Sequence, residues 1–278
     1  MTATMDAVRE GAAAISESAG ACLEVRGVTK RFDNGVHALG PVDLDLRQGE
    51  FFSIVGPSGC GKTTLLDIVA GLNTPTSGSV RFEGKPVGAE VPLGVGIVFQ
   101  DDASFPWLSV FDNIAFGLRR RGTEASEVQR RVTDAIEFMG LAGFANARPS
   151  QLSGGMRQRV CIARTLVLQP RLILLDEPFG ALDQQTRLLM GDELLKLWRA
   201  TGASVLLITH SLDEAAMLSD RIGVMSARPG RFLGTLRTEW PKSRTSEIAA
   251  HERFGRLTAE LWERLRGESM KAMRGSAQ

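Results

Sequence analysis

The sequence lacks several features that would assign it to other classes of protein. Only three of its 278 residues are cysteines, and none forms a CxxC pair, which disfavours a zinc ribbon or disulfide framework and fits a reducing cytoplasm. Lys and Arg total 33 against 32 Asp and Glu, so the strong positive charge of a nucleic-acid binder is missing. The most apolar runs have the length of strands, far below the roughly 20 residues of a membrane helix, so we expect no membrane span.

The first residues do not have the pattern of a secretion signal. Residues 1–21 are rich in Ala, Ser and Glu, and they carry Asp6, Arg9 and Glu10 where a signal peptide needs an apolar centre. We expect a flexible leader in this segment.

Residues 23–236 alternate short apolar runs with helical patterns, which predicts an α/β core around a largely parallel sheet. The predicted strands are 23–25, 51–55, 80–82, 95–99, 172–175, 205–209, 222–225 and 232–236. Between residues 99 and 172 helical periodicity replaces the strand signal, notably over 128–139 and 156–168, which indicates a helical insertion.

After Trp240 the chain ends in a segment with helical spacing. Phe254, Leu257, Leu261 and Leu265 recur every three or four residues and form one apolar stripe. Such a stripe either docks on the core of its own chain or contacts another subunit, and the first is the commoner arrangement.

A phosphate-binding motif follows the strand 51–55 and precedes the helical pattern 65–72. The match to GxxxxGK[ST] comprises Gly56, Pro57, Ser58, Gly59, Cys60, Gly61, Lys62, Thr63 and Thr64. Backbone amides of such a loop converge on phosphates at a helix N-terminus, Lys62 reaches the β and γ phosphates, and the Thr63 hydroxyl ligates Mg²⁺. Because Cys60 lies within the motif, we expect its alkylation to block the nucleotide.

Two acids end the apolar strand 172–175, at the edge of a parallel sheet where ligands bind. In combination with a phosphate loop, Asp176 is expected to hold the Mg²⁺ shell. Glu177, one residue further out, is placed to act as the general base that polarises the attacking water.

The sequence Leu152-Ser153-Gly154-Gly155-Met156 opens the helical pattern 156–168. With this segment the chain resembles the ABC-transporter ATPases, whose signature normally reads LSGGQ, so Met156 departs from the pattern. The resemblance implies that Ser153, Gly154 and Gly155 face the γ-phosphate of a nucleotide held by the opposite subunit. A serine, two glycines and a helix N-terminus suit an anion site.

Four further positions match the same family, in its order. The resemblance implies that Phe32 stacks on adenine, where relatives more often have the tyrosine that this chain lacks. It implies that Gln100 touches Mg²⁺ and the water and senses the membrane partner. Asp183 would cross the dimer interface, and it is also suited to cap the following helix. His210 would contact the γ-phosphate and orient Glu177.

The resemblance also implies the fold and its division into domains. We expect an α/β fold: a P-loop (RecA-like) ABC ATPase core, with an antiparallel β subdomain and an inserted helical subdomain at about 101–168. The nucleotide-binding domain would span 22–240, and a C-terminal helical extension 241–278.

With one phosphate loop and no membrane helices, the chain resembles the separate ATP-binding subunit of an importer. The family pattern implies ATP and Mg²⁺, a head-to-tail homodimer, transmembrane permease subunits and, indirectly, a solute-binding protein, with no nucleic acid. It places the chain peripherally on the cytoplasmic face of the inner (plasma) membrane. The apolar segment 105–118 would partly pack inside the helical subdomain and partly form a groove for a permease helix.

The amino-acid sequences of residues 105–118, of LSGGMRQRV and of SARPG resemble those of the importer ATPases in the nitrate, sulfonate and taurine branch. The implied cargo is a small anion, and the branch also includes carriers of other nitrogenous solutes. A regulatory ABC ATPase without a transport role is the alternative from a different class.

Overall fold

The computed structural model describes residues 21–100, 103–180 and 182–275. The expected leader lies outside the described residues except for Ala21. That residue begins the first strand and so is not part of a flexible segment.

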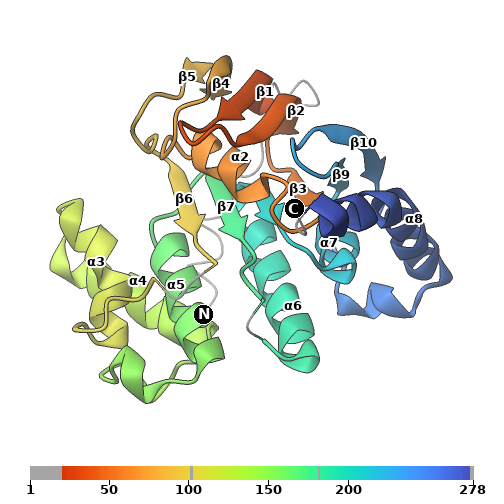
Figure 1. The fold of residues 1–278 in the computed structure, drawn as a ribbon. Coiled ribbons are helices and arrows are strands. Elements are labelled where there is room, and N and C mark those ends of the chain that lie inside the picture. The colour runs from red at the N-terminus through yellow and green to blue at the C-terminus, as the bar shows by residue number, and fades with distance from the viewer. Residues whose placement is uncertain (1–20, 101–102, 181, 276–278) are drawn as a thin grey trace.

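Four strands form an antiparallel sheet in the order β2-β1-β4-β5. They are β1 (Ala21–Arg31), β2 (His37–Arg47), β4 (Ser77–Phe82) and β5 (Lys85–Pro86). The predicted strands 23–25 and 80–82 therefore belong to a sheet separate from the parallel one, where they pair antiparallel with each other. Figure 1 shows this sheet at one end of the molecule, above helix α2.

Strand β2 is a strand that the sequence analysis missed. Val42, Leu44 and Leu46 are buried and alternate with exposed residues, as expected of a strand with one face on a core. Pro41 interrupts the pattern in the sequence, but it is tolerated because β2 is an edge strand.

Six strands form the main sheet, in the order β10-β9-β3-β8-β7-β6. They are β3 (Phe51–Val55), β6 (Val95–Val98), β7 (Leu172–Asp176), β8 (Ser204–Ile208), β9 (Arg221–Met225) and β10 (Phe232–Arg237). All pairs are parallel except β9 with β10, which confirms the largely parallel sheet. Every residue of β3, β7 and β8 is buried, because helices or the second sheet cover both faces.

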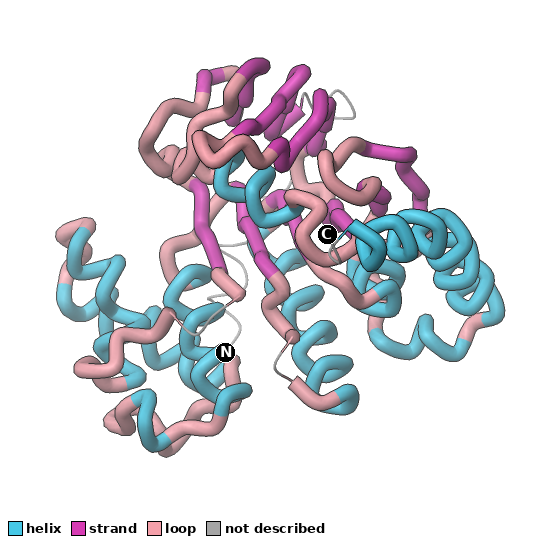
Figure 2. Tube along the Cα trace, viewed as in Figure 1, coloured by secondary structure: helices cyan, strands magenta, loops and turns pink. Residues whose placement is uncertain are grey.

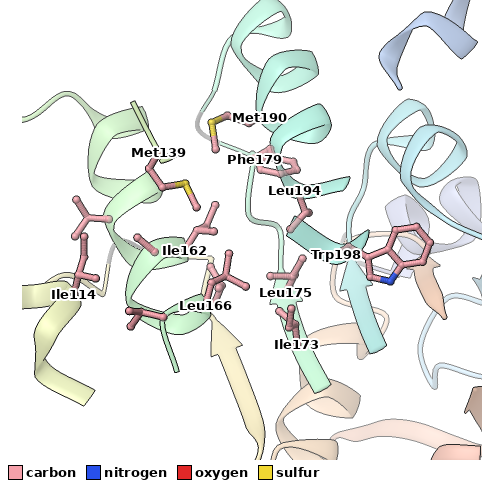
Figure 3. Close-up of a cluster of buried hydrophobic side chains, with 14 of the residues drawn as sticks. Ile114, Met139, Ile162, Leu166, Ile173, Leu175, Phe179, Met190, Leu194 and Trp198 are labelled. Atoms are coloured by element: carbon pink, nitrogen blue, oxygen red, sulfur yellow. The ribbon is translucent and has the colours of Figure 1, made fainter. Parts of the chain in front are cut away.

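The face of the main sheet that carries Phe52, Ile54 and Leu174 packs on α2 (Lys62–Val69) and on the antiparallel sheet. The opposite face belongs to the largest apolar cluster. Figure 3 shows Ile173 and Leu175 of this cluster on β7, with Ile162 and Leu166 on one side and Leu194 and Trp198 on the other.

A group of helices stands beyond β6, at the left of Figure 1. It contains α3 (Val110–Arg120), α4 (Ala125–Phe138), a short 3₁₀ turn (Pro149–Gln151) and α5 (Gly154–Leu166). Ile114, Met139 and Ile162 join this group to the cluster under the main sheet (Figure 3). Packing is thus continuous from these helices to the acidic end of β7.

The remaining helices lie to the right of the α3–α5 group in the shared view of Figures 1 and 2. They are α6 (Gln184–Thr201), α7 (Leu212–Leu218), a 3₁₀ segment (Ser246–Ala250) and α8 (Glu252–Gly275). Leu257, Leu261 and Leu265 of α8 are buried against Val55 and Val224, so the terminal stripe docks on the core of its own chain.

Among the helices of residues 21–100, 103–180 and 182–275, none is both long and apolar enough to cross a membrane.

Candidate functional site

The carboxyl ends of β3, β6, β7 and β8 lie along one edge of the main sheet, because these strands are parallel. The loops that leave this edge carry most of the predicted site residues. The phosphate motif follows β3, Gln100 follows β6, Glu177 follows β7 and His210 follows β8.

The loop at residues 56–61 turns tightly into α2, which begins at Lys62. Gly61 has a φ of 108°, and a Cβ there would lie 2.7 Å from the carbonyl oxygen of Ala38, so only glycine fits. The Lys62 ammonium is buried under the loop and donates to the carbonyl oxygens of Gly56 at 2.8 Å and Pro57 at 3.0 Å. The loop and its lysine therefore form one compact cationic cradle.

Glu177 is the centre of a polar cluster. Its Oε2 lies 3.0 Å from Nδ1 of His210 and 3.4 Å from Nε2 of Gln100, which donates to it. The Glu177 backbone has a φ of 46°, in the left-handed region that non-glycine residues rarely adopt, and its amide donates to the carbonyl of Ile208. Such local strain is typical of functional positions.

Asp176 sits deeper than Glu177 and is almost fully buried. Burial raises the pKa of this carboxyl. The Thr63 hydroxyl donates a hydrogen bond to it, which opposes the rise without cancelling it. Its Oδ1 has no hydrogen-bond partner among the described residues. A buried carboxylate oxygen without a partner, beside a threonine hydroxyl, suits Mg²⁺ with the nucleotide supplying further oxygens.

Thr63, Gln100, Glu177 and His210 line a cavity of about 590 Å³, whereas Asp176 is not among its lining residues. Its walls are Phe32, Val36, Ala38, Ser58, Gly59, Gly61, Lys62, Thr63, Thr64, Gln100, Glu177, His210 and Arg228. Phe32 is half-buried, with the Lys30 ammonium 5.1 Å from its ring centroid. The cavity lining therefore combines apolar side chains with cationic and acidic groups, as a nucleotide requires.

Three members of the motif do not line this cavity: Gly56, Pro57 and Cys60. The carbonyls of the first two hold Lys62. Cys60 packs into the core, and its burial raises the pKa of its thiol. The nearby Lys62 ammonium acts in the opposite direction, but its effect is smaller. The environment of Cys60 therefore opposes its alkylation, since the thiolate is the reactive form.

Ser153, Gly154, Gly155 and Asp183 are not among the residues that line the cavity. Ser153 caps α5 and accepts from the amide of Met156 at 3.3 Å. Asp183 caps α6 and accepts from the amide of Thr186 at 3.0 Å, which confirms the predicted cap. Ser153, Gly154 and Asp183 are exposed, so they are available to another molecule.

Arg228 is a residue of the cavity that sequence reasoning did not assign. It lies in the loop after β9, within the SARPG stretch that served only for the family resemblance. A single arginine in a loop carries no recognisable signal until the fold brings that loop against the phosphate motif.

Residues 39–180 match the protein family described as ABC transporter, and this range includes the phosphate loop, Gln100, Ser153 and both acids. The chain belongs to the ABC transporter family. It is an ATP-binding subunit of that family and an ATPase.

The chain is similar to import ATP-binding proteins that serve different solutes. A taurine import ATP-binding protein of Jannaschia sp. is 48% identical over 76% of this chain and 80% of its own. A spermidine/putrescine import ATP-binding protein of Mesoplasma florum is 47% identical over 77% of this chain and 61% of its own. An ATP-binding cassette solved as a dimer in a post-hydrolysis state with ADP and phosphate has a TM-score of 0.71. It is 31% identical and covers 79% of this chain and all of its own. These matches confirm the ABC ATPase fold predicted from the sequence.

Proposed function

We propose that this chain energises the uptake of a small anion, in the class of nitrate, sulfonates and taurine, by hydrolysing ATP for a separate permease. The ATPase site rests on one observation above all: Glu177, His210 and Gln100 contact one another and line the same cavity as the phosphate loop. The import role rests on the likeness to taurine import proteins.

In the proposed site the adenine ring stacks on Phe32, and the phosphates lie on the amides of residues 58–64 and on Lys62. Thr63, Gln100 and Asp176 would hold Mg²⁺, which would supply neutralisation of the phosphate charge. Glu177 takes a proton from water as the water oxygen bonds to the γ phosphorus and the bond to the bridging oxygen breaks, which yields ADP and phosphate. His210 and Gln100 hold the carboxylate of this base in place.

A second copy of the chain completes the site in this proposal. Ser153 and Gly154 are exposed and Gly155 is half-buried at the start of α5, and none of the three lines the cavity of its own subunit. In a head-to-tail dimer they would meet the γ-phosphate bound by the partner, and Asp183 would lie at the interface. The dimeric structural relative supports this arrangement. Closure on ATP and reopening after hydrolysis would drive the permease between its two states.

The permease contact is proposed on the α3 side. The segment 105–118 divides as expected: Ile114 and Leu118 are buried, whereas Trp107 is 68% exposed and Phe116 is 41% exposed. Phe105 stacks on Trp107 at 5.6 Å and touches Phe116 at 4.8 Å between ring centroids. Such an exposed aromatic cluster suits an apolar helix from a membrane subunit and would hold the chain peripherally at the cytoplasmic face. A solute-binding protein would act only through the permease.

The test is uptake of labelled taurine, alkanesulfonate, nitrate and putrescine by cells whose only copy carries Lys62→Ala. The matched control is Lys196→Ala, an exposed lysine of α6 paired with Glu193. Loss of uptake of one anion in the first strain alone supports the proposal. Loss of putrescine uptake instead assigns the polyamine class, the second candidate suggested by the Mesoplasma relative. If no uptake changes while the purified protein hydrolyses ATP, the assignment to these solutes is wrong, and the import of another solute or a regulatory ATPase without a transport role takes its place.

A further inference from the structure

The loop after β9 lies against the phosphate loop. Arg228 Nε donates to the carbonyl oxygen of Gly59 at 3.1 Å. A Cβ on Gly59 would come within 3.1 Å of Arg228 Nη2, so the guanidinium covers the turn of the phosphate loop. Arg228 is exposed and lines the same cavity as Lys62.

Backbone contacts fix the position of this loop. The Gly230 amide donates to the carbonyl of Ala38 at 2.9 Å, and the Gly230 carbonyl accepts from the amide of Gly40 at 3.0 Å. A Cβ on Gly230 would lie 2.2 Å from the carbonyl oxygen of Cys60, so the loop is wedged between β2 and the phosphate loop. Arg228 therefore projects from a fixed base.

The C-terminal helix holds the other side of the loop. Glu268 Oε2 accepts from the amide of Ala227 at 2.8 Å, and Glu268 Oε1 lies 2.6 Å from the Lys271 ammonium. The Glu268 side chain is only 12% exposed, and α8 is anchored beneath it by buried Leu261 and Leu265. A continuous path thus runs from α8 through Ala227 and Arg228 to Gly59.

We propose that Arg228 is a further ATP-binding residue that contacts the polyphosphate beside Lys62, and that Glu268 of the C-terminal helix positions it. A guanidinium suits this role because its several donors form a planar fork that matches phosphate oxygens. In addition, a nucleoside triphosphate carries more negative charge than the Lys62 ammonium alone can balance. α8 then affects ATP affinity from outside the cavity. This inference rests on the ATP site proposed above.

The test compares charge and geometry at position 228. Arg228→Gln removes the charge and keeps an amide donor, whereas Arg228→Lys keeps the charge. A hydrogen bond to a charged group contributes enough that we expect Arg228→Gln to raise the MgATP KM and Kd roughly tenfold with kcat within about threefold. Arg228→Lys should recover most of the affinity. Binding of AMP, which lacks the β and γ phosphates, should change less than about twofold in both variants.

Glu268 is tested as a positioning residue. Glu268→Ala removes the acceptor for the Ala227 amide, and Lys271→Ala is the matched control because it removes only the ion pair. We expect Glu268→Ala to raise the ATP KM about threefold, Lys271→Ala to leave it unchanged, and the double variant Arg228→Gln/Glu268→Ala to equal Arg228→Gln alone. Thermal unfolding of each variant shows that it is folded.

The inference is overturned if Arg228→Gln binds MgATP as the unchanged protein does, or if ATP and AMP lose affinity equally. Full additivity of the two substitutions would overturn the role of Glu268. The proposed ATP site is judged separately by Lys62→Ala: loss of ATP binding there, with normal binding in Arg228→Gln, refutes only this inference.

Discussion

The docking of α8 predicts a large loss of stability when its central leucine is truncated. Leu261 is 0% exposed and packs with Val55, Ala215 and Val224. Leu261→Ala removes three carbon groups at about 0.8 kcal/mol each, which gives about 2.4 kcal/mol before the cavity is counted. With the cavity left behind, we expect a loss of about 3 to 4 kcal/mol in the free energy of unfolding.

The assay is urea denaturation followed by circular dichroism, with thermal unfolding as a second measurement. For a chain of this size about 3 kcal/mol corresponds to a fall in Tm of roughly 6 to 12 °C. Leu189→Ala is the matched control, because Leu189 on α6 is 67% exposed and its truncation should change stability by less than about 0.5 kcal/mol. A loss below about 1 kcal/mol for Leu261→Ala would refute the docking of α8, and with it the path from α8 to the phosphate loop.

Two further predictions concern the core and the cysteines. Phe179→Ala should lower the free energy of unfolding by about 3 to 5 kcal/mol. Phe179 is fully buried, two residues after Glu177, in the cluster that joins the main sheet to the α3–α5 helices. A change in Tm no larger than that of Leu189→Ala would contradict this prediction. At pH 8, a thiol reagent should react with Cys22, Cys60 and Cys161 far more slowly in the native protein than in urea, because all three are buried. Burial also raises the pKa of the Cys22 and Cys60 thiols, which lowers the fraction of reactive thiolate at that pH. Rapid labelling of native Cys60 would contradict the structure.

The parts of this molecule that the sequence predicts best are those whose signal is local. The phosphate loop, the acidic end of β7 and the alternation of apolar strands and helices all follow from spacing and residue type. Glu177 and His210 could be placed at strand ends by the same reasoning, and the structure puts them 3.0 Å apart.

Other parts depend on contacts between distant segments. Strand β2 shows the alternation Val42, Leu44, Leu46, but Gly40 and Pro41 concealed it, and its edge position is decided by pairing with β1. Sequence patterns alone extended the first helix to residue 72, whereas α2 ends at Val69 before Gly71 with its φ of 73°. Arg228 enters the cavity only because Gly230 packs against Cys60, a contact that no pattern predicts.

The most direct test of the account is single-turnover ATP hydrolysis by Glu177→Gln. The substitution keeps the shape of the side chain and removes the carboxylate that His210 and Gln100 hold. We predict that MgATP binding changes less than about threefold, while the hydrolysis rate falls roughly 10²- to 10⁴-fold, the usual contribution of a general base. Hydrolysis within about threefold of the unchanged protein would contradict the assignment of Glu177 as the base of this site.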